Sequence, residues 1–349
     1  MRLERRTVVP WDIVLLAPVG AVTVALALCA GLIGMAGVNP LKAYAEMING
    51  AFGSRLAITE TLTRAIPLIL TGLAAAVAFR SRIWNIGAEG QFYLGALFTA
   101  WAGHGLVGGL PAILAIPILM IGGMIAGALL LAGPVLLRLR LGVDEVVTTL
   151  LLNFIIILFV GMMVEGPLKD PLGFGWPQSV PVDRAFMLPD LVARSRLHIG
   201  LLVALAAAGL IWLVLSRTVF GAETRAAGLN PRAAAFSGIP LSQTLFLVSL
   251  LSGGLAGLAG AIEVLGVTGY VTTTMSPGYG YAGIVVAMLA ALHPAGVVGA
   301  ALFVATIFVG ADAMSRATGV PSFIADVIMS VSLLTMLAAL LFTTYRIRR

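Results

Sequence analysis

The sequence predicts an all-α protein that crosses a membrane many times. Of its 349 residues, 60% are hydrophobic and only 10% are charged, and the mean hydropathy is +1.06. A soluble domain of this size carries roughly a quarter charged residues. Several apolar runs exceed the roughly 18 residues that span a hydrocarbon core. The short alternating segments typical of a β-barrel are not seen in the sequence, so we expect a polytopic helical fold.

We expect about ten transmembrane helices, read from the apolar runs in chain order. The first follows the basic start MRLERR and is expected to be an uncleaved span rather than a signal peptide. The eighth run is too short to cross alone, so we expect a broken or tilted pair with the segment before it. The ten runs cover residues 12–37, 57–79, 84–104, 111–137, 144–165, 198–216, 240–263, 281–292, 294–311 and 322–343.

The basic residues orient these spans. With the N-terminus inside, most of the 21 lysines and arginines fall in inner loops, as the positive-inside rule requires. An even number of spans returns the C-terminus to the same side. The net charge of +6 therefore reflects membrane orientation, and we expect no nucleic-acid partner. The single cysteine, Cys29, excludes an intrachain disulfide and a metal site built on several thiolates.

Three segments between spans have a distinct composition. Residues 39–52 have apolar side chains at helical spacing and are expected to form a helix along the membrane interface. Residues 166–197 are rich in proline and are expected to be an irregular extracytoplasmic loop. Residues 217–239 form the longest inner loop, and Pro231 after Asn230 is typical of a helix start. A helix with so few bulky side chains is expected to dock on another protein, with a solvated connector as the alternative.

The span order also indicates an internal duplication. Five spans precede residues 166–197 and five follow them, so the second five would run inverted relative to the first. Each half contains a glycine-interrupted polar segment, NIGAEGQ or SPGYGYAG. Paired interruptions of this kind mark the substrate path in inverted-repeat transporters. The expected fold therefore includes a 5+5 inverted repeat and some broken helices.

The polar stretch FRSRIWNIGAEGQFYLG, residues 79–95, is the first candidate site. If the third span begins near residue 84, Asn85 and Glu89 stand one turn apart on the same helix face. An ionisable side chain inside a span is by default a functional hypothesis. The alternative for Glu89 is structural: it could hydrogen-bond to the backbones of neighbouring helices or pair with an inner-loop arginine. Arg80 and Arg82 place the stretch near the inner face, which favours an inner gate or helix packing over cargo recognition.

Other polar and aromatic side chains fall within the apolar runs. Asn153 either lines a path or bonds another helix. Tyr279 and Tyr281 are either interfacial belt residues or platforms that stack on a flat ring. Asp144 and Glu145, beside two arginines, are expected to form a solvated cluster at the inner face. The candidates for a substrate path are Asn85, Glu89, Gln91, Asn153, Tyr279 and Tyr281.

Several chemistries are excluded by missing motifs. The two lysines, Lys42 and Lys169, each follow leucine, so the Gly-Lys-Ser/Thr of a phosphate-binding loop is absent and the chain does not hydrolyse ATP by itself. The three histidines, His104, His198 and His293, form no HExxH pair, so no metal site is expected. No GxSxG elbow is present either. We expect neither enzyme activity nor a bound cofactor.

Five strings together resemble the membrane-spanning permeases of ABC-type importers. They are FRSRIWNIGAEGQFYLGA, LGVDEVVTTLLLNFI, GPLKDPLGFGWPQS, TRAAGLNPRAAAFSGI and SPGYGYAGIVVAMLAALHPAGVV. The resemblance covers residues 55–345 and is greatest with the nucleoside and simple-sugar branch, related to ribose and branched-chain amino acid permeases. It implies a translocation path for a nucleoside or simple sugar in a bacterial cytoplasmic membrane, opened by alternating access. The alternative is an ion-coupled secondary transporter of a small polar solute, which would need no partner ATPase.

The resemblance also implies a set of partners and an arrangement of the chain. The partners are a second permease in a heterodimer, a cytoplasmic subunit that binds the ATP, an extracytoplasmic substrate-binding protein and membrane lipid. Residues 1–349 would form one permease domain with both termini in the cytoplasm. The inner loop at 217–239 would dock on the ATPase. Its matching positions are Glu223, Arg225, Gly228, Asn230 and Gly238.

Overall fold

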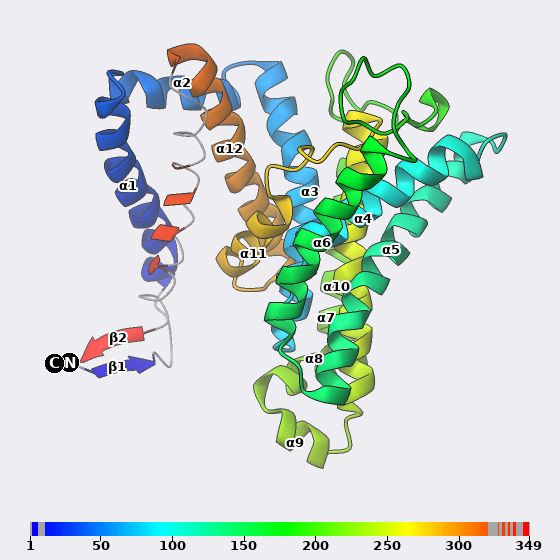
Figure 1. Cartoon of the computed structure of the whole chain (residues 1–349). Helices are drawn as coiled ribbons and strands as arrows, with labels where there is room; N and C mark the ends of the chain where they lie inside the picture. The colour runs from blue at the N-terminus through cyan, green and yellow to red at the C-terminus, as the bar shows by residue number, and fades with distance from the viewer. Residues whose placement is uncertain are drawn as a thin grey trace. The chain divides into compact units, whose positions relative to one another are not determined.

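The computed structural model describes residues 2–5, 11–319 and 345–348, with scattered positions between 327 and 339. Apart from one pair of short strands, its elements are helices (Figure 1). The chain divides into two compact units, Met1–Arg64 with Leu302–Arg349, and Ala65–Ala301. Two helices contribute to both units. They are α3 (Arg55–Arg80) and α12 (Pro294–Thr318).

The first unit contains a sharply bent pair of helices. Asn39 begins the second of them, since its side chain accepts the N–H of Leu41 at 2.9 Å and Pro40 follows at a position that needs no donor. The bend between the helices is 116°. Cys29 and Met314 belong to one buried cluster in this unit. Its elements, besides parts of α3 and α12, are β1 (Arg2–Arg5), α1 (Trp11–Met35), α2 (Pro40–Phe52) and β2 (Tyr345–Arg348), and β1 pairs antiparallel with β2.

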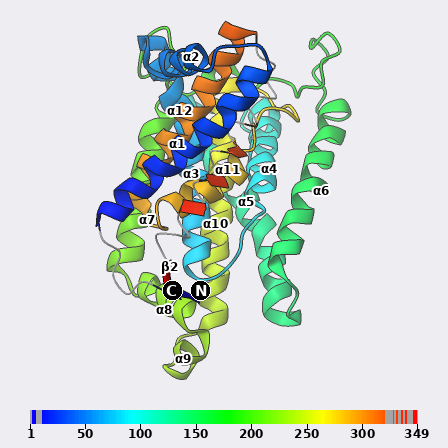
Figure 2. The same ribbon diagram turned by 90° about the vertical axis from the view of Figure 1, so that its left-hand side faces the viewer.

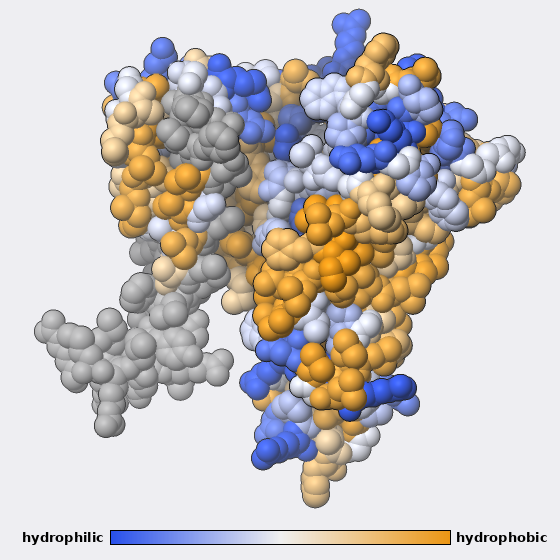
Figure 3. Space-filling model, viewed as in Figure 1, coloured by the Kyte–Doolittle hydropathy of each residue, from blue (hydrophilic) through white to orange (hydrophobic). Residues whose placement is uncertain are grey.

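The second unit is built around α3 and α10. Of the 18-residue apolar segment of each helix, 89% is buried in α3 and 72% in α10 with η3, whereas only 22% is buried in α5 and in α6. The latter two therefore present apolar faces outward, and Figure 3 shows apolar side chains gathered over the middle of α6. The elements are α4 (Ala88–Trp101), η1 (Ala102–Leu106), α5 (Ala112–Leu141), α6 (Glu145–Glu165), η2 (Arg184–Phe186), α7 (Gly200–Arg217), α8 (Val219–Leu229), α9 (Pro231–Phe236), α10 (Leu241–Glu263), η3 (Val264–Thr268) and α11 (Tyr279–Leu289).

Glycines bring α10 into close contact with its neighbours. Gly257 of α10 lies against Gly127 of α5 and Gly95 of α4, and a Cβ on Gly257 would overlap the carbonyl oxygen of Gly123. Figures 1 and 2 show α10 beside α5 in both views. Small residues at four-residue spacing allow helix backbones to approach in this way inside a membrane.

Six described helices are long and apolar enough to span a membrane, or seven if the bent pair in the first unit counts as one span. The expected span at 281–292 appears as the short helix α11, as the sequence predicts. The expected span at 84–104 begins four residues later, since α4 starts at Ala88. It ends in a π-helical turn, Ala102–Leu106. The last expected span, 322–343, lies outside the continuously described residues.

Segments 166–197 and 217–239 have the local structure that the sequence predicts. Residues 166–199 are irregular, with one short helix and isolated bridges. His198 closes this segment, and its Nδ1 accepts the N–H of Gly200 at 3.1 Å. Burial lowers the pKa of His198 to about 4, against an opposing effect of Asp190, so the imidazole is neutral at pH 7. In segment 217–239, the side chain of Asn230 begins α9 by accepting the N–H groups of Arg232 and Ala233.

Candidate functional site

The candidate site is a break between α3 and α4. After Arg80 the chain runs through residues 81–87 without helix, and α4 then begins at Ala88. The expectation that Asn85 and Glu89 share one helical face is therefore wrong, since Asn85 precedes the helix. The reason is long-range, because the backbone groups of the break hydrogen-bond to side chains of α6 rather than to helical neighbours.

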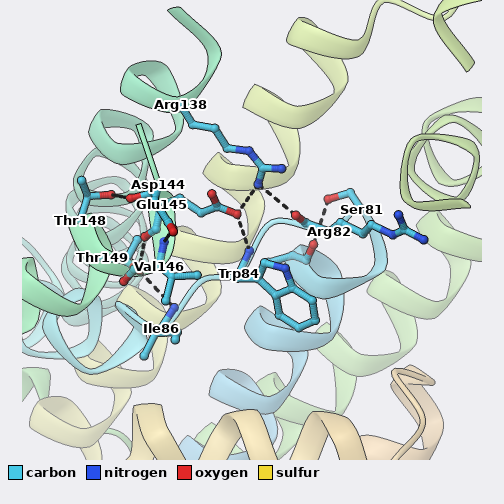
Figure 4. Close-up of polar contacts among 11 residues, drawn as sticks. Ser81, Arg82, Trp84, Ile86, Arg138, Asp144, Glu145, Val146, Thr148 and Thr149 are labelled. Carbon is cyan, nitrogen blue, oxygen red and sulfur yellow. Dashed lines mark hydrogen bonds and ion pairs between the residues drawn. The ribbon is translucent and has the colours of Figure 1, made fainter. Parts of the chain in front are cut away.

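A polar stripe on α6 replaces those missing helical hydrogen bonds. Glu145, Thr149 and Asn153 follow one another at four-residue spacing and are all buried. Glu145 Oε1 accepts the N–H of Trp84 at 3.2 Å, and Thr149 Oγ1 accepts that of Ile86 at 3.3 Å. Figure 4 shows both side chains directed at the break. Asn153 Nδ2 donates to the carbonyl of Ile86 at 2.8 Å, so unwound backbone is satisfied inside the protein, as membrane depth requires.

Arg138, at the end of α5, completes this network. It donates to the carbonyl of Arg82 at 2.9 Å and forms an ion pair with Glu145 (Figure 4). The expected solvated cluster is thus only half correct. Asp144 is exposed and caps α6 by accepting the N–H of Val146, whereas Glu145 is buried because the break covers it.

Asn85 and Gln91 form a reciprocal pair on the opposite side of the break. Each side-chain amide donates to the carbonyl oxygen of the other at 2.9 Å. Asn85 also donates to Ser252 of α10 at 3.0 Å, and Ser252 donates to the carbonyl of Ala74 in α3 at 2.8 Å. All three side chains are buried. These polar groups therefore join α3, α4 and α10 in this conformation.

Glu89 joins the first turn of α4 to the first turn of α11. Its Oε2 accepts the N–H of Gly280 at 2.6 Å, and Ser276 also hydrogen-bonds to the carboxyl group. The Ser276 hydroxyl in turn accepts the N–H groups of Gly278 and Tyr279. A Cβ on Gly280 would overlap the backbone of Glu89, so the two helix starts touch. The carboxyl group therefore lies at the first turns of two helices, where backbone N–H groups lack helical acceptors.

The two tyrosines differ in exposure. Tyr279 is buried, and its ring centroid lies 5.8 Å from that of Phe92. Tyr281 is 38% exposed, and its hydroxyl accepts a hydrogen bond from Asn153 at 3.1 Å. Asn153 Oδ1 also accepts the N–H of Gly90 at 2.8 Å. The structure thus brings all six path candidates together around the starts of α4 and α11, and Tyr281 is the exposed member of the six.

The candidate coupling residues in segment 217–239 lie in two groups. Glu223 and Arg225 tie α8 to the membrane helices, since Thr244 donates to Glu223 Oε2 at 3.2 Å and Arg225 donates to the carbonyl of Leu215 at 2.8 Å. Gly228 also packs inward, against the last residue of α3. The other two define α9, with Asn230 as its cap and Gly238, at φ +83°, beyond its end.

The sequence reasoning missed three residues that complete the site. Thr149 had a signal, because it lies midway between Glu145 and Asn153 at the same four-residue spacing. Ser276 lies in the quoted string SPGYGYAG, but its partner Glu89 is far away in the sequence, and Ser252 had no signal. The described residues contain no group of three or more His, Cys, Asp or Glu side chains that could bind a metal ion.

Comparison with known proteins identifies the family. Residues 57–341 match the family described as "Branched-chain amino acid transport system / permease component". The glucose ABC transporter permease protein TsgB13 of Haloferax volcanii is 34% identical over 99% of this chain and 93% of its own length. The guanosine ABC transporter permease protein NupP of Bacillus subtilis is 34% identical over 92% of each chain. A second guanosine permease of that bacterium, NupQ, is 28% identical over 70% of this chain and 78% of its own.

No solved structure matches the chain. The family match covers both the break between α3 and α4 and the start of α11, and the relatives extend over most of the sequence. The chain therefore belongs to the family of membrane permease components of ABC transport systems that is named for branched-chain amino acid transport.

Proposed function

We propose that the ABC importer to which this permease belongs carries a nucleoside or a simple sugar. Family membership makes the chain a permease subunit of such a transporter, and multi-pass insertion agrees with its apolar helices. The cargo class is inferred from relatives named for guanosine and for glucose. An ion-coupled secondary transporter is not favoured, because these relatives are named as ABC transporter permeases.

The hydrogen bond from Gly280 to Glu89 is the observation that carries the proposed mechanism. We place the cargo path beside the contact between α4 and α11, and alternating access opens it when these helix starts separate. Amide, carboxyl and phenol groups suit sugar hydroxyls and base edges. Tyr281 is exposed already, so cargo would meet it first. The proposed path residues are Asn85, Glu89, Gln91, Asn153, Tyr279 and Tyr281.

The proposed architecture is a single domain, residues 1–349, with about ten spans in two inverted sets of five. Two broken segments support it, because residues 81–87 fall in the first set and residues 269–278 in the second. The helices that follow them, α4 and α11, meet at the contact between Glu89 and Gly280. The distribution of basic residues supports cytoplasmic termini. We propose the inner membrane of a bacterium as the location.

The proposed partners follow from the same family. A cytoplasmic ATPase subunit binds the ATP and docks on residues 217–239, and an extracytoplasmic binding protein delivers cargo near residues 166–197. The exposed side chains of Leu229 and Phe236 support the first contact, since they lie on α8 and α9 without covering a core. Two distinct guanosine permeases in one bacterium, NupP and NupQ, both resemble this chain, which supports a heterodimer of permeases. We assign no reaction and no cofactor to the chain itself.

Reconstitution tests this proposal. The permease is placed in liposomes with its cognate ATPase, second permease and binding protein, and uptake of labelled guanosine and glucose is measured. We expect ATP-dependent accumulation of one cargo class. If the cargo is a nucleoside, Tyr281→Ala raises the half-saturating concentration and Tyr281→Phe does not, because only the ring stacks on the base. Uphill transport by the lone permease, driven by an ion gradient, would contradict the proposal.

A further inference from the structure

The inner end of α3 touches both the cytoplasmic helix α8 and the turn that follows α11. We propose that Arg80 is the positioning residue that transmits movement of α8 to α11, and through α11 to the contact at Glu89. The inference rests on the proposed docking of residues 217–239 on the ATPase. It adds to that function the internal route by which ATP-driven motion reaches the cargo path.

The first contact is backbone to backbone. Gly228, near the end of α8, is buried, and a Cβ there would overlap the carbonyl oxygen of Arg80. Such a close approach leaves no room for α8 to shift without displacing the last turn of α3. Arg225 and Glu223, on the same helix, bond to Leu215 and Thr244, so α8 is held to the inner ends of two further helices. Movement of α8 is therefore passed on to the helix ends around it.

The second contact is made by the side chain of Arg80. Its Nη2 donates to the carbonyl oxygen of Leu292 at 3.3 Å. Leu292 and the preceding Ala291 have φ values of +60° and +48°. Two consecutive residues with side chains in the left-handed region are uncommon, and such a conformation persists only where the surroundings enforce it. The guanidinium of Arg80 is thus bound to a turn that stores conformational strain.

The helix α11 connects the turn at Ala291 and Leu292 to the start of α4. It contains 11 residues, and a helix of that length is a rod of about 16 Å. Its last turn leads into Ala291 and Leu292, with the N–H of Leu292 bonded to the carbonyl of Ala287 at 2.8 Å. Its first turn contains Gly280, which donates to Glu89. A displacement at one end therefore appears at the other, where α4 begins.

The rest of α11 is held on α3 independently of Arg80. Thr71 donates to the carbonyl of Tyr279 at 2.9 Å, and Gly283 and Val286 pack against Thr71 and Gly72. Removal of the Arg80 side chain therefore leaves most of the contact between α3 and α11 in place. For this reason we expect variants at Arg80 to fold and to assemble with their partners.

The test compares the variants Arg80→Gln and Arg80→Lys with the matched control Arg82→Gln. Arg82 loses the same charge two residues further on, and its exposed side chain points away from the hydrogen-bond network in Figure 4. Each permease is assembled in liposomes with all partners, and ATP hydrolysis and cargo uptake are measured together. We expect Arg80→Gln to lower cargo carried per ATP by at least about fivefold, the lower end of typical coupling energies. Arg80→Lys restores part of this ratio, and Arg82→Gln keeps the wild-type ratio.

A second measurement follows the turn directly. In the wild-type complex, ATP changes amide hydrogen exchange over residues 287–293, and in Arg80→Gln we expect this change to be lost. If Arg80→Gln lowers hydrolysis and uptake in equal proportion, or lowers only the yield of assembled complex, Arg80 has a structural role and the inference is wrong. A wild-type complex without ATP-driven uptake would instead refute the proposed function, so the two failures are distinguishable.

Discussion

Asn153 performs with one side chain what a continuous helix would do with several backbone groups. Its amide accepts the N–H of Gly90 at 2.8 Å and donates to the carbonyl of Ile86 at 2.8 Å, on either side of the start of α4. Asn153 is fully buried, so neither backbone group has access to water when the side chain is removed. A polar residue in a span is thus explained here by the backbone that it satisfies.

We predict that Asn153→Leu destabilises the protein by about 2 to 6 kcal/mol, because the N–H of Gly90 and the carbonyl of Ile86 are left unpaired at a cost of about 1 to 3 kcal/mol each. Thermal unfolding in detergent measures this loss. Thr149→Val, which removes the acceptor of the Ile86 N–H, is expected to cost about 1 kcal/mol.

Thr148→Val is the matched control for that series. Thr148 is adjacent on α6, and its hydroxyl bonds only within the helix, to the carbonyl of Asp144 (Figure 4). We expect its unfolding temperature to stay within a degree or two of the wild type. Equal effects of the two Thr→Val changes would show that the α6 stripe does not support the break.

At the scale of elements, local signals in the sequence predicted helix ends well and the break less well. Asn230 before Pro231 predicted the start of α9, and the short apolar run at 281–292 predicted a short α11. The start of α4 was placed too early, near residue 84. The apolar pattern resumes there, but the hydrogen bonds that keep the chain unwound come from α6, about 60 residues away. Such partners cannot be read from local periodicity.

The packing of α10 on α5 leads to a prediction at the same scale. Gly257→Ala places a methyl group into the carbonyl of Gly123, so the helices must separate along their contact. Overpacking of this kind costs about 1 to 3 kcal/mol. We expect a lower unfolding temperature in detergent and weaker assembly of the transporter.

Gly254→Ala on the same helix provides the control. A Cβ at Gly254 would meet its nearest atom, the carbonyl oxygen of Met124, at 3.5 Å, which is ordinary van der Waals contact. Gly254 is buried, but no neighbouring atom has to move, and alanine is favoured over glycine in a helix interior by about 1 kcal/mol, so we expect no loss of stability. If both alanine variants are equally stable, the glycines of α10 are not needed for close approach.

For the whole molecule, composition was sufficient to predict an all-helical membrane protein, and the five quoted strings together were sufficient to indicate its family. The candidate site was found in part. Glu89 and Asn153 were singled out as polar residues within spans, but their present partners, Gly280 and Ile86, follow from tertiary packing. The number of spans stays a prediction beyond the six or seven that the described helices support.

The proposed roles of residues 166–197 and 217–239 depend on which face of the membrane each segment occupies. One long apolar helix, α7, separates residues 166–197 from residues 217–239, so the two segments are expected on opposite faces of the membrane. Charge alone does not orient α7, because lysines and arginines occur on both sides of it. They are Lys169, Arg184, Arg194 and Arg196 before it, and Arg217, Arg225 and Arg232 at its end and after it. The orientation instead follows from counting spans from the N-terminus.

Cysteine labelling decides this orientation. Cys29 is the single cysteine and is buried, so Cys29→Ala gives a background without thiols. Trp176 is 73% exposed and Phe236 is 95% exposed, and a cysteine at either position is accessible to a membrane-impermeant maleimide. We expect Trp176→Cys to react in intact right-side-out vesicles and Phe236→Cys only in inside-out vesicles. Reaction of both from one face would mean that α7 does not cross the membrane. The reverse pattern would place residues 217–239 outside, where no ATPase can reach them.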